Sequence, residues 1–213
     1  MTAVKRPRVG ILGAGRMASG LAQLLTEAGH DVVISRREPR RPGADAPPAT
    51  SFEEAAEFGD IVVLAIPHAG VGSLAASIGE RTRGKVLVDI TNAVVYADGR
   101  TRSGLTGISN GSWVAARFPQ ARVTRAYNHI QDELLVSRAH RQPGNWAVAV
   151  AGDDEEAVQE TSKLVVATHY IPVRVGTLEE SVVIDPGGPV FPHMFTPADL
   201  SDVIAAATGR EGE

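Results

Sequence analysis

The sequence predicts an α/β fold in which a doubly wound, mostly parallel sheet carries a small C-terminal α/β extension. Short apolar runs alternate with helical stretches through the first two thirds of the chain, which is the pattern of parallel strands joined by crossover helices. The 213 residues, 43% of them hydrophobic and 22% charged, suffice for one full core and a small second lobe. We expect the first lobe over residues 1–125 and the C-terminal lobe over 126–213.

The first three elements are recognisable by their composition and their ends. "RVGILG" at 8–13 is an apolar run of strand length, and "RMASGLAQLLTEAG" at 16–29 is a helix that ends at Gly29, a frequent C-terminal cap. "DVVISR" at 31–36 is rich in β-branched residues and predicts a second strand. A strand, a helix and a strand therefore open the fold.

The same alternation continues through the rest of the chain. Ser51 and Glu54 form a capping box that opens a short helix over 51–59, and a strand at 60–67 is stopped by Pro67. We expect further helices over 71–82, from 112, over 153–167 and from about Pro197, and further strands over 85–91, 123–127, 145–152 and 170–176. Residues 186–197 are expected to form a loop because they are rich in proline and glycine.

The junction between the first strand and the first helix carries the motif "GILGAGRMA". Gly13, Gly15 and Ala18 have the GxGxxA spacing of a Rossmann-like fold, in which the first glycine permits a tight turn and the second lets the backbone approach a pyrophosphate. The helix N-terminus adds unpaired N–H groups and a positive dipole. We therefore predict dinucleotide binding by Gly13, Ala14, Gly15, Arg16 and Met17; the alternative is a glycine turn that serves packing alone.

The end of the second strand predicts which dinucleotide is bound. NAD-binding folds place a carboxylate there for the ribose hydroxyls, whereas an arginine accommodates the 2′-phosphate of NADP. This chain has Ser35, Arg36 and Arg37 at that position, so we expect NADP(H), with Arg16 also reaching the phosphate. The alternative is that the arginines of this stretch, Arg36, Arg37, Arg40 and Arg41, simply solvate a loop.

With these residues placed, the chain resembles the coenzyme F420-dependent NADP oxidoreductase family. The resemblance lies in "VGILGAGRMASGLAQLLTEAGHDVVISRR" (9–37), "DIVVLAIP" (60–67), "TRAYNHI" (124–130) and "AVAVAGDDEEAVQETSKLV" (147–165). "GAGRMA" alone would equally suit a pyrroline-carboxylate reductase, whereas "AYN" and "GDDEEA" are more distinctive. The resemblance implies direct ring-to-ring hydride transfer between NADPH and a deazaflavin, coenzyme F420, as co-substrate.

The resemblance and the sheet topology together place the rest of the site. Ligands of open parallel sheets bind beyond the carboxyl ends of the strands. We expect Ile66, Pro67, His68, Asn92 and Ala93 at the cofactor, and Asn128, His129 and Ile130 at the acceptor pocket. No catalytic acid or base is required, although His129 is a possible one; alternatively, it satisfies a backbone group, and the two asparagines form turns.

The chain departs from the family's pattern in the segments that the resemblance places around the acceptor pocket. "GTLEES" stands from Gly176, where the family has a glycine-rich passage and then Pro-Leu, and "HAGVGSL" after Pro67 finds no clear counterpart. An NADPH-dependent reductase of a small imine, carbonyl or flavin, with His129 or Tyr127 as proton donor, is therefore an alternative. A non-catalytic NADPH-sensing module is a further one.

Composition limits the partners. The net charge of −4 argues against binding nucleic acid or a membrane surface, and the absence of cysteine excludes disulfides and thiolate metal sites. The histidines have no metal-ligand spacing, and no 18-residue apolar span occurs, so we expect no metal and a cytoplasmic protein. The apolar residues of the loop at 186–197 suggest a homodimer; they are Val190, Phe191, Met194 and Phe195.

Overall fold

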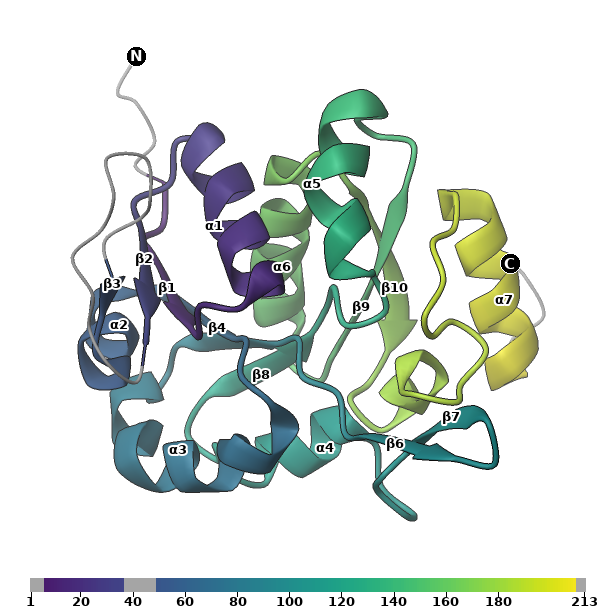
Figure 1. Ribbon diagram of the computed structural model, residues 1–213, viewed down its shortest axis with the longest axis horizontal. Helices are drawn as coiled ribbons and strands as arrows, with labels where there is room; N and C mark the ends of the chain where they lie inside the picture. The colour runs from purple at the N-terminus through teal and green to yellow at the C-terminus, as the bar shows by residue number, and fades with distance from the viewer. Residues whose placement is uncertain (1–5, 37–48, 210–213) are drawn as a thin grey trace.

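The computed structural model describes residues 6–36 and 49–209, and its centre is an eight-stranded sheet (Figure 1). The strands of this sheet are β1 (Val9–Leu12), β2 (Val32–Ser35), β3 (Ala49–Thr50), β4 (Ile61–Leu64), β5 (Val86–Asp89), β8 (Arg122–Arg125), β9 (Ala147–Gly152) and β10 (Ile171–Gly176). They lie in the order β10-β9-β8-β5-β4-β1-β2-β3. The predicted mostly parallel α/β sheet is confirmed.

One strand pair departs from the parallel arrangement. β8 and β9 are antiparallel, with Thr124 opposite Gly152, while β9 and β10 are parallel to each other. β9 and β10 therefore run against the other six strands, and the carboxyl ends of β1, β4, β5 and β8 share one edge of the sheet. Because β8 and β9 pair directly, both expected lobes contribute to one sheet, and the boundary at residue 125 stays a prediction.

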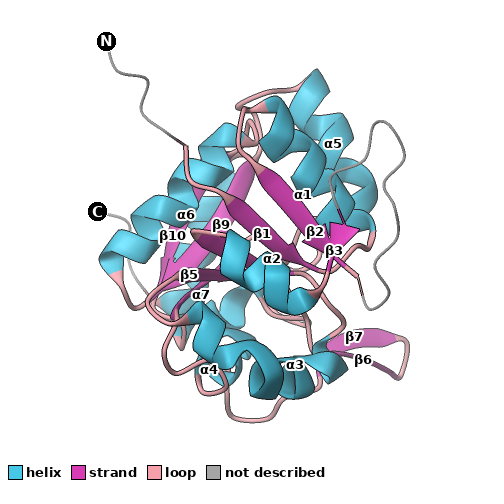
Figure 2. Cartoon of the chain, turned by 90° about the vertical axis from the view of Figure 1, so that its left-hand side faces the viewer, coloured by secondary structure: helices cyan, strands magenta, loops and turns pink. Residues whose placement is uncertain are grey.

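Helices cover both faces of the sheet (Figures 1 and 2). The helices are α1 (Arg16–Glu27), α2 (Phe52–Phe58), α3 (Val71–Ile78), α4 (Asn110–Ala115), α5 (Asp132–Arg141), α6 (Glu155–Ala167) and α7 (Pro197–Thr208), with 3-10 turns η1 (His68–Gly70), η2 (Gly79–Thr82) and η3 (Glu180–Ile184). One core cluster joins α1, α5 and α6 to the sheet, a second joins α2, α3 and α4, and α7 packs beside β10. β1, β4 and β5 are buried along their whole lengths, as strands covered on both faces should be.

The elements that sequence analysis missed include β3, η3, α5 and a hairpin of β6 (Val94–Ala97) and β7 (Arg100–Ser103). α5 buries only Leu135 and Ala139, which is too narrow an apolar stripe to stand out, although acidic residues at its start and basic residues at its end favour a helix. The hairpin turns at Asp98 and Gly99, both with positive φ, which is a known two-residue turn signal. The helix predicted over 71–82 is also divided into α3 and η2.

The loop at 186–197 packs several apolar side chains against the rest of the chain. Val190 is fully buried in the cluster around β9, β10 and α7, and Phe195 packs against the same cluster, while Met194 packs against the larger core. These side chains have contacts within one copy of the chain, and the homodimer stays a prediction.

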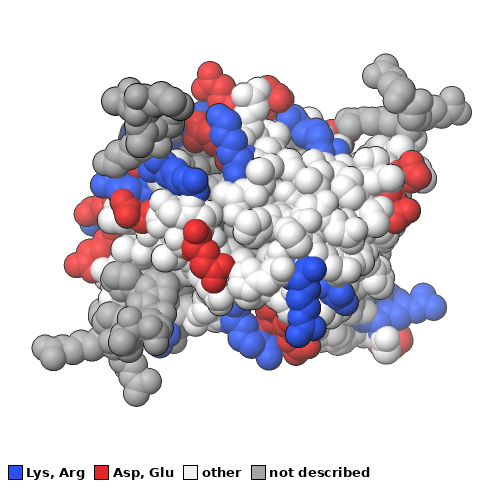
Figure 3. Space-filling model, turned by 90° about the horizontal axis from the view of Figure 1, so that it is seen from above, with Lys and Arg blue, Asp and Glu red and all other residues white. Residues whose placement is uncertain are grey.

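The surface carries charges of both signs. Seen from above, Lys and Arg side chains alternate with Asp and Glu around an uncharged centre (Figure 3). On this face, the described residues therefore form no continuous basic surface for a polyanion. Among the described residues, no helix is both long enough and apolar enough to cross a membrane.

Candidate functional site at the carboxyl ends of the strands

The two glycines between β1 and α1 are glycines for different reasons. Gly13 has φ +135°, and a Cβ there would lie 2.2 Å from the Ala65 carbonyl oxygen, so the fold itself requires glycine. Gly15 has an ordinary φ of −74°, and its Cβ would meet no described atom within 4 Å. Nothing within the described chain explains Gly15, whereas a ligand lying close against the start of α1 would.

The start of α1 is suited to an anion. Gly15 offers no side-chain cap, and the first turn of α1 contains no acidic residue. The backbone N–H groups of this turn and the helix dipole are thus available to a phosphate. The predicted residues Ala14 and Met17 are half-buried and pack against the core.

The predicted 2′-phosphate residues take different roles. The Ser35 hydroxyl is fully buried, accepts a hydrogen bond from the Gly13 N–H at 3.2 Å and donates to the Ile11 carbonyl at 3.2 Å. Ser35 therefore ties the end of β2 to β1 and to the glycine loop, and its contact with a ligand stays a prediction. Arg36 follows β2 directly, and its Nε is buried without a hydrogen-bond partner among the described residues. Arg37, Arg40 and Arg41 lie outside the described residues.

Arg16 has a partner within the chain. Its Nε donates to Asp132 Oδ2 of α5 at 2.6 Å, and its side chain is 73% exposed. The guanidinium thus joins the starts of α1 and α5. Reaching a 2′-phosphate would require it to leave this ion pair.

The segment after β4 places His68 in an aromatic stack, while the neighbouring Pro67 is exposed. The centroids of the His68 and Trp113 rings are 4.2 Å apart. The Arg117 guanidinium carbon lies over the Trp113 ring, 3.2 Å from its centroid. Partial burial lowers the pKa of His68, and the Asp89 carboxylate opposes this shift. His68 Nδ1 has no partner among the described residues. The half-buried Ile66 side chain stands close to Gly13.

A pocket of about 210 Å³ lies between α1 and the ends of β5 and β8. Five residues expected at the site line it together: Met17, Asn92, Asn128, His129 and Ile130. Its other lining residues include Ile90, Tyr127, Gln131, Phe191 and Pro192. Ala93 is buried beside it, with its N–H bonded to Asn110 Oδ1 at 3.3 Å, and does not line the pocket.

The two candidate proton donors of this pocket are held in structural hydrogen bonds. His129 is fully buried; its Nδ1 donates to the His193 carbonyl at 2.9 Å, and its Nε2 accepts the Ala149 N–H at 3.1 Å. Burial lowers the pKa of His129 to about 4. The Tyr127 hydroxyl pairs with Thr168 Oγ1 at 2.8 Å, and burial raises its pKa. Neither side chain is therefore placed to transfer a proton near neutral pH.

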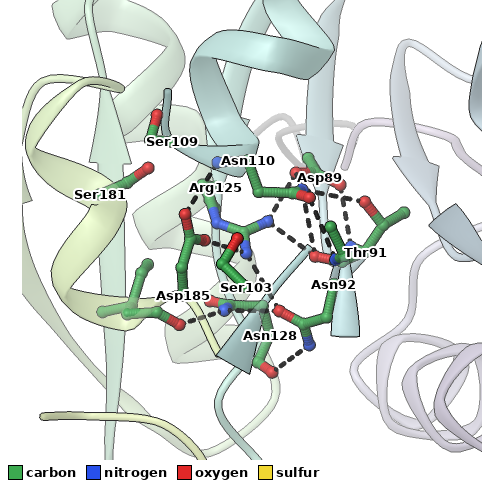
Figure 4. A network of polar contacts seen from close by, with 12 residues as sticks. Asp89, Thr91, Asn92, Ser103, Ser109, Asn110, Arg125, Asn128, Ser181 and Asp185 are labelled. Carbon is green, nitrogen blue, oxygen red and sulfur yellow. Dashed lines mark hydrogen bonds and ion pairs between the residues drawn. The ribbon is translucent and has the colours of Figure 1, made fainter. Parts of the chain in front are cut away.

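Beneath the pocket lies a buried cluster of charges that sequence analysis missed (Figure 4). Arg125 at the end of β8 is fully buried and bonds Asp89 Oδ2 and Asp185 Oδ1, each at 2.6 Å. Asn110 Nδ2 donates to Asp89 at 2.8 Å, and burial raises the pKa of Asp89 against the effect of the guanidinium. The sequence signal was a charged residue at the end of each of two apolar strands, "VLVD" and "VTR".

The cluster continues into the two asparagines of the pocket (Figure 4). Asn92 Oδ1 accepts from Arg125 Nη2 and from Asn128 Nδ2, both at 3.1 Å, and Asn92 Nδ2 donates to the Asn128 carbonyl at 2.8 Å. Asn128 Nδ2 also donates to the Ile184 carbonyl at 2.6 Å. These bonds join separate strands, so neither asparagine serves only its own turn.

The sheet, the start of α1 and the pocket at the strand ends together have the arrangement of a dinucleotide-binding fold. Residues 8–93 match the family described as NADP oxidoreductase, coenzyme F420-dependent. The F420-dependent NADP reductase of Methanothermobacter thermautotrophicus is 26% identical over 192 residues, covering 81% of this chain and 82% of that protein. A crystal structure of a proposed F420-dependent NADP reductase from Arthrobacter has a TM-score of 0.72 at 25% identity and covers 83% of this chain and 88% of its own. Residues 8–93 of the chain are thus similar to this NADP-dependent oxidoreductase family.

Other similar proteins act on different substrates. Metalloreductase STEAP3 of Rattus norvegicus is 32% identical over 175 residues, which is 81% of this chain and 34% of that protein. The chain spans about a third of the length of the two metalloreductases it matches. The pyrroline carboxylate reductase of Plasmodium falciparum shares the fold, with a TM-score of 0.57 at 14% identity over 81% of this chain and 58% of its own.

Proposed function

We propose that this protein transfers hydride between NADPH and a deazaflavin of the coenzyme F420 type by direct ring-to-ring transfer. The observation that carries the proposal is the pocket beside the glycine loop, whose two candidate proton donors, His129 and Tyr127, are held in structural hydrogen bonds. Transfer of hydride between two rings needs placement and exclusion of water, and no side-chain acid or base. The pocket offers these conditions.

Three features of the chain fit NADP(H). Within the described part of the chain, Gly15 leaves room that suits a pyrophosphate, and Arg36 Nε has no partner and suits a 2′-phosphate. Asn128 Oδ1 likewise has no partner there and suits a donor on the nicotinamide end. Gly13, Ala14, Gly15 and Met17 would hold the centre of the cofactor, with Arg37 predicted beside Arg36. When bound, NADPH supplies the hydride.

The pocket residues orient the ring and exclude water. Met17 borders the pocket from α1, Ile90 and Ile130 from the ends of two strands, and Phe191 from the C-terminal segment. Apolar walls from several elements fix the plane of a ring, and they lower the local polarity around it. Gln131 and Asp132 form the polar rim.

The test is a comparison of acceptors. NADPH would be mixed with the protein and, separately, with oxidised coenzyme F420, FMN and FAD, while nicotinamide absorbance and acceptor bleaching are followed together. We expect rapid reduction of the deazaflavin and slow or no reduction of the flavins. Binding of NADPH without reduction of coenzyme F420 would overturn the deazaflavin assignment.

A second candidate is an NADPH-dependent flavin reductase, favoured by the 32% identity to a metalloreductase. Reducing a metal ion takes single electrons, whereas NADPH gives two as hydride, and a flavin can divide the pair. In the same assay, reduction of FMN or FAD in preference to coenzyme F420 would identify this activity. A reductase of small imines or carbonyls is less favoured, because it would need the proton donor that His129 and Tyr127 do not supply.

A further inference from the structure

The Asn128 side chain presents a buried acceptor that nothing in the described chain satisfies. Asn128 lines the pocket and is 4% exposed, and its Oδ1 has no hydrogen-bond partner among the described residues. A buried acceptor without a partner costs about 1–3 kcal/mol. A ligand that brings a donor to this atom would remove that cost.

The orientation of this amide is set by Arg125. A guanidinium can only donate hydrogen bonds, so Asn92 must turn its oxygen toward Arg125 Nη2 at 3.1 Å. The Asn92 amide nitrogen then donates to the Asn128 carbonyl at 2.8 Å, and Asn92 Oδ1 accepts from Asn128 Nδ2.

Asn128 Nδ2 also donates to the Ile184 carbonyl at 2.6 Å, so both of its hydrogens have acceptors in the chain. Rotating the Asn128 amide by half a turn would set its oxygen against two acceptor oxygens. Oδ1 is therefore the atom left for a ligand, and the ligand must supply an N–H or O–H group.

The place of the pocket indicates which group this is. Met17, in the first turn of α1 directly after the glycine loop, lines the pocket. The pocket lies at the carboxyl ends of β5 and β8, on the far side of β1 from β2. A dinucleotide with its 2′-phosphate at the end of β2 and its pyrophosphate at α1 extends its nicotinamide end toward this edge. The donor that the nicotinamide carries is its carboxamide NH₂.

We propose that Asn128 Oδ1 accepts an N–H of the nicotinamide carboxamide, and that Arg125 acts as a positioning residue that sets the polarity of the Asn92–Asn128 amide pair. Asn128 thereby selects a carboxamide over a ring substituent that lacks a donor. This inference rests on the proposed NADPH-dependent function.

The experiment compares two oxidised cofactors without any acceptor present. NADP⁺ and its 3-acetylpyridine analogue differ at the carboxamide, where the analogue carries a methyl ketone and no N–H. Their dissociation constants would be measured by calorimetry for the wild type, Asn128→Ala and the control Asn145→Ala, which alters an exposed asparagine before β9. We expect the wild type and the control to prefer NADP⁺ by about tenfold and Asn128→Ala to bind both about equally.

A third ligand separates this inference from the proposed function. 2′,5′-ADP contains the 2′-phosphate but no nicotinamide, so we expect it to bind all three proteins equally. Failure of all three ligands to bind the wild type would contradict the proposed function. Binding of NADP⁺ and its analogue with equal affinity by the wild type, or an unchanged preference in Asn128→Ala, would overturn the role of Asn128 and leave the proposed function standing.

The role of Arg125 has its own test. Lysine can also only donate hydrogen bonds, so Arg125→Lys should keep the preference for NADP⁺ even if the protein is less stable. Glutamine can offer an oxygen to Asn92 and allow both amides to turn, so Arg125→Gln should lose most of the preference. An unchanged preference in Arg125→Gln, measured below its unfolding temperature, would show that Arg125 does not set the amide polarity.

Discussion

Alanine substitutions at the two loop glycines should separate folding from cofactor binding. At Gly13 the new Cβ would lie 2.2 Å from the Ala65 carbonyl oxygen, at φ +135°. Backbone strain of about 1–3 kcal/mol and overpacking of about 1–3 kcal/mol together predict a loss near 4 kcal/mol. For a chain of this length, that lowers the unfolding temperature by about 10 °C.

At Gly15 the same substitution should leave the fold nearly unchanged. Its φ is ordinary and its Cβ meets no described atom, so the expected cost is that of an alanine N-cap, within about 1 kcal/mol. The methyl group would instead hold a phosphate away from the start of α1. Losing one charge-assisted bond of about 1.5–3 kcal/mol would raise the dissociation constant for NADPH about tenfold to a hundredfold.

Thermal unfolding followed by circular dichroism and NADPH titration followed by fluorescence would measure both quantities on both variants. The reasoning fails if Gly15→Ala binds NADPH as tightly as the wild type. It also fails if Gly15→Ala is destabilised as much as Gly13→Ala, because the glycine would then serve packing.

Three further predictions concern single side chains. Arg36→Ala should weaken NADPH binding about tenfold and leave NADH binding unchanged, and equal losses for both in titrations would refute the 2′-phosphate contact. Asp185→Ala leaves a buried guanidinium with one carboxylate, so denaturant unfolding should show a loss of about 3 kcal/mol, against less than about 0.5 kcal/mol for exposed Glu80→Ala. Burial lowers the pKa of His129 to about 4 in the folded protein, whereas the ordinary value is about 6.5. As the pH falls below about 6.5, His129 is therefore protonated in the unfolded chain before it is protonated in the folded one. Stability present above pH 6.5 should thus decline by about 3 kcal/mol toward pH 4, and His129→Asn should flatten this decline.

Local patterns predicted the Rossmann-like half of the molecule well. β1, α1 and β2 lie where apolar runs, the glycine spacing and Gly29 indicated, and the capping box of Ser51 and Glu54 opens α2. Such signals depend on residues within a few positions of one another. Strands, helix caps and glycine turns can therefore be predicted from a single sequence.

The side-chain roles in the site could not be read in this way. Ser35 and Arg36 are neighbours at the end of β2, yet their side chains differ in role. The Ser35 hydroxyl bonds the glycine loop and β1, whereas Arg36 Nε has no partner among residues 6–36 and 49–209. His129 followed a strand like any candidate proton donor, but its two nitrogens meet backbone groups from β9 and the C-terminal segment. A side chain's role depends on what the neighbouring segment supplies.

The buried charge cluster is the clearest case of this limit. Asp89, Arg125 and Asp185 are separated by 36 and 60 positions in the chain, and they meet because β5 and β8 are adjacent and η3 folds back over their ends. The glycine loop and the strands that frame it follow from short-range sequence patterns. The orientation of the Asn92 and Asn128 side-chain amides follows from long-range packing. The Arg125 guanidinium can set this orientation only after folding has brought it next to Asn92.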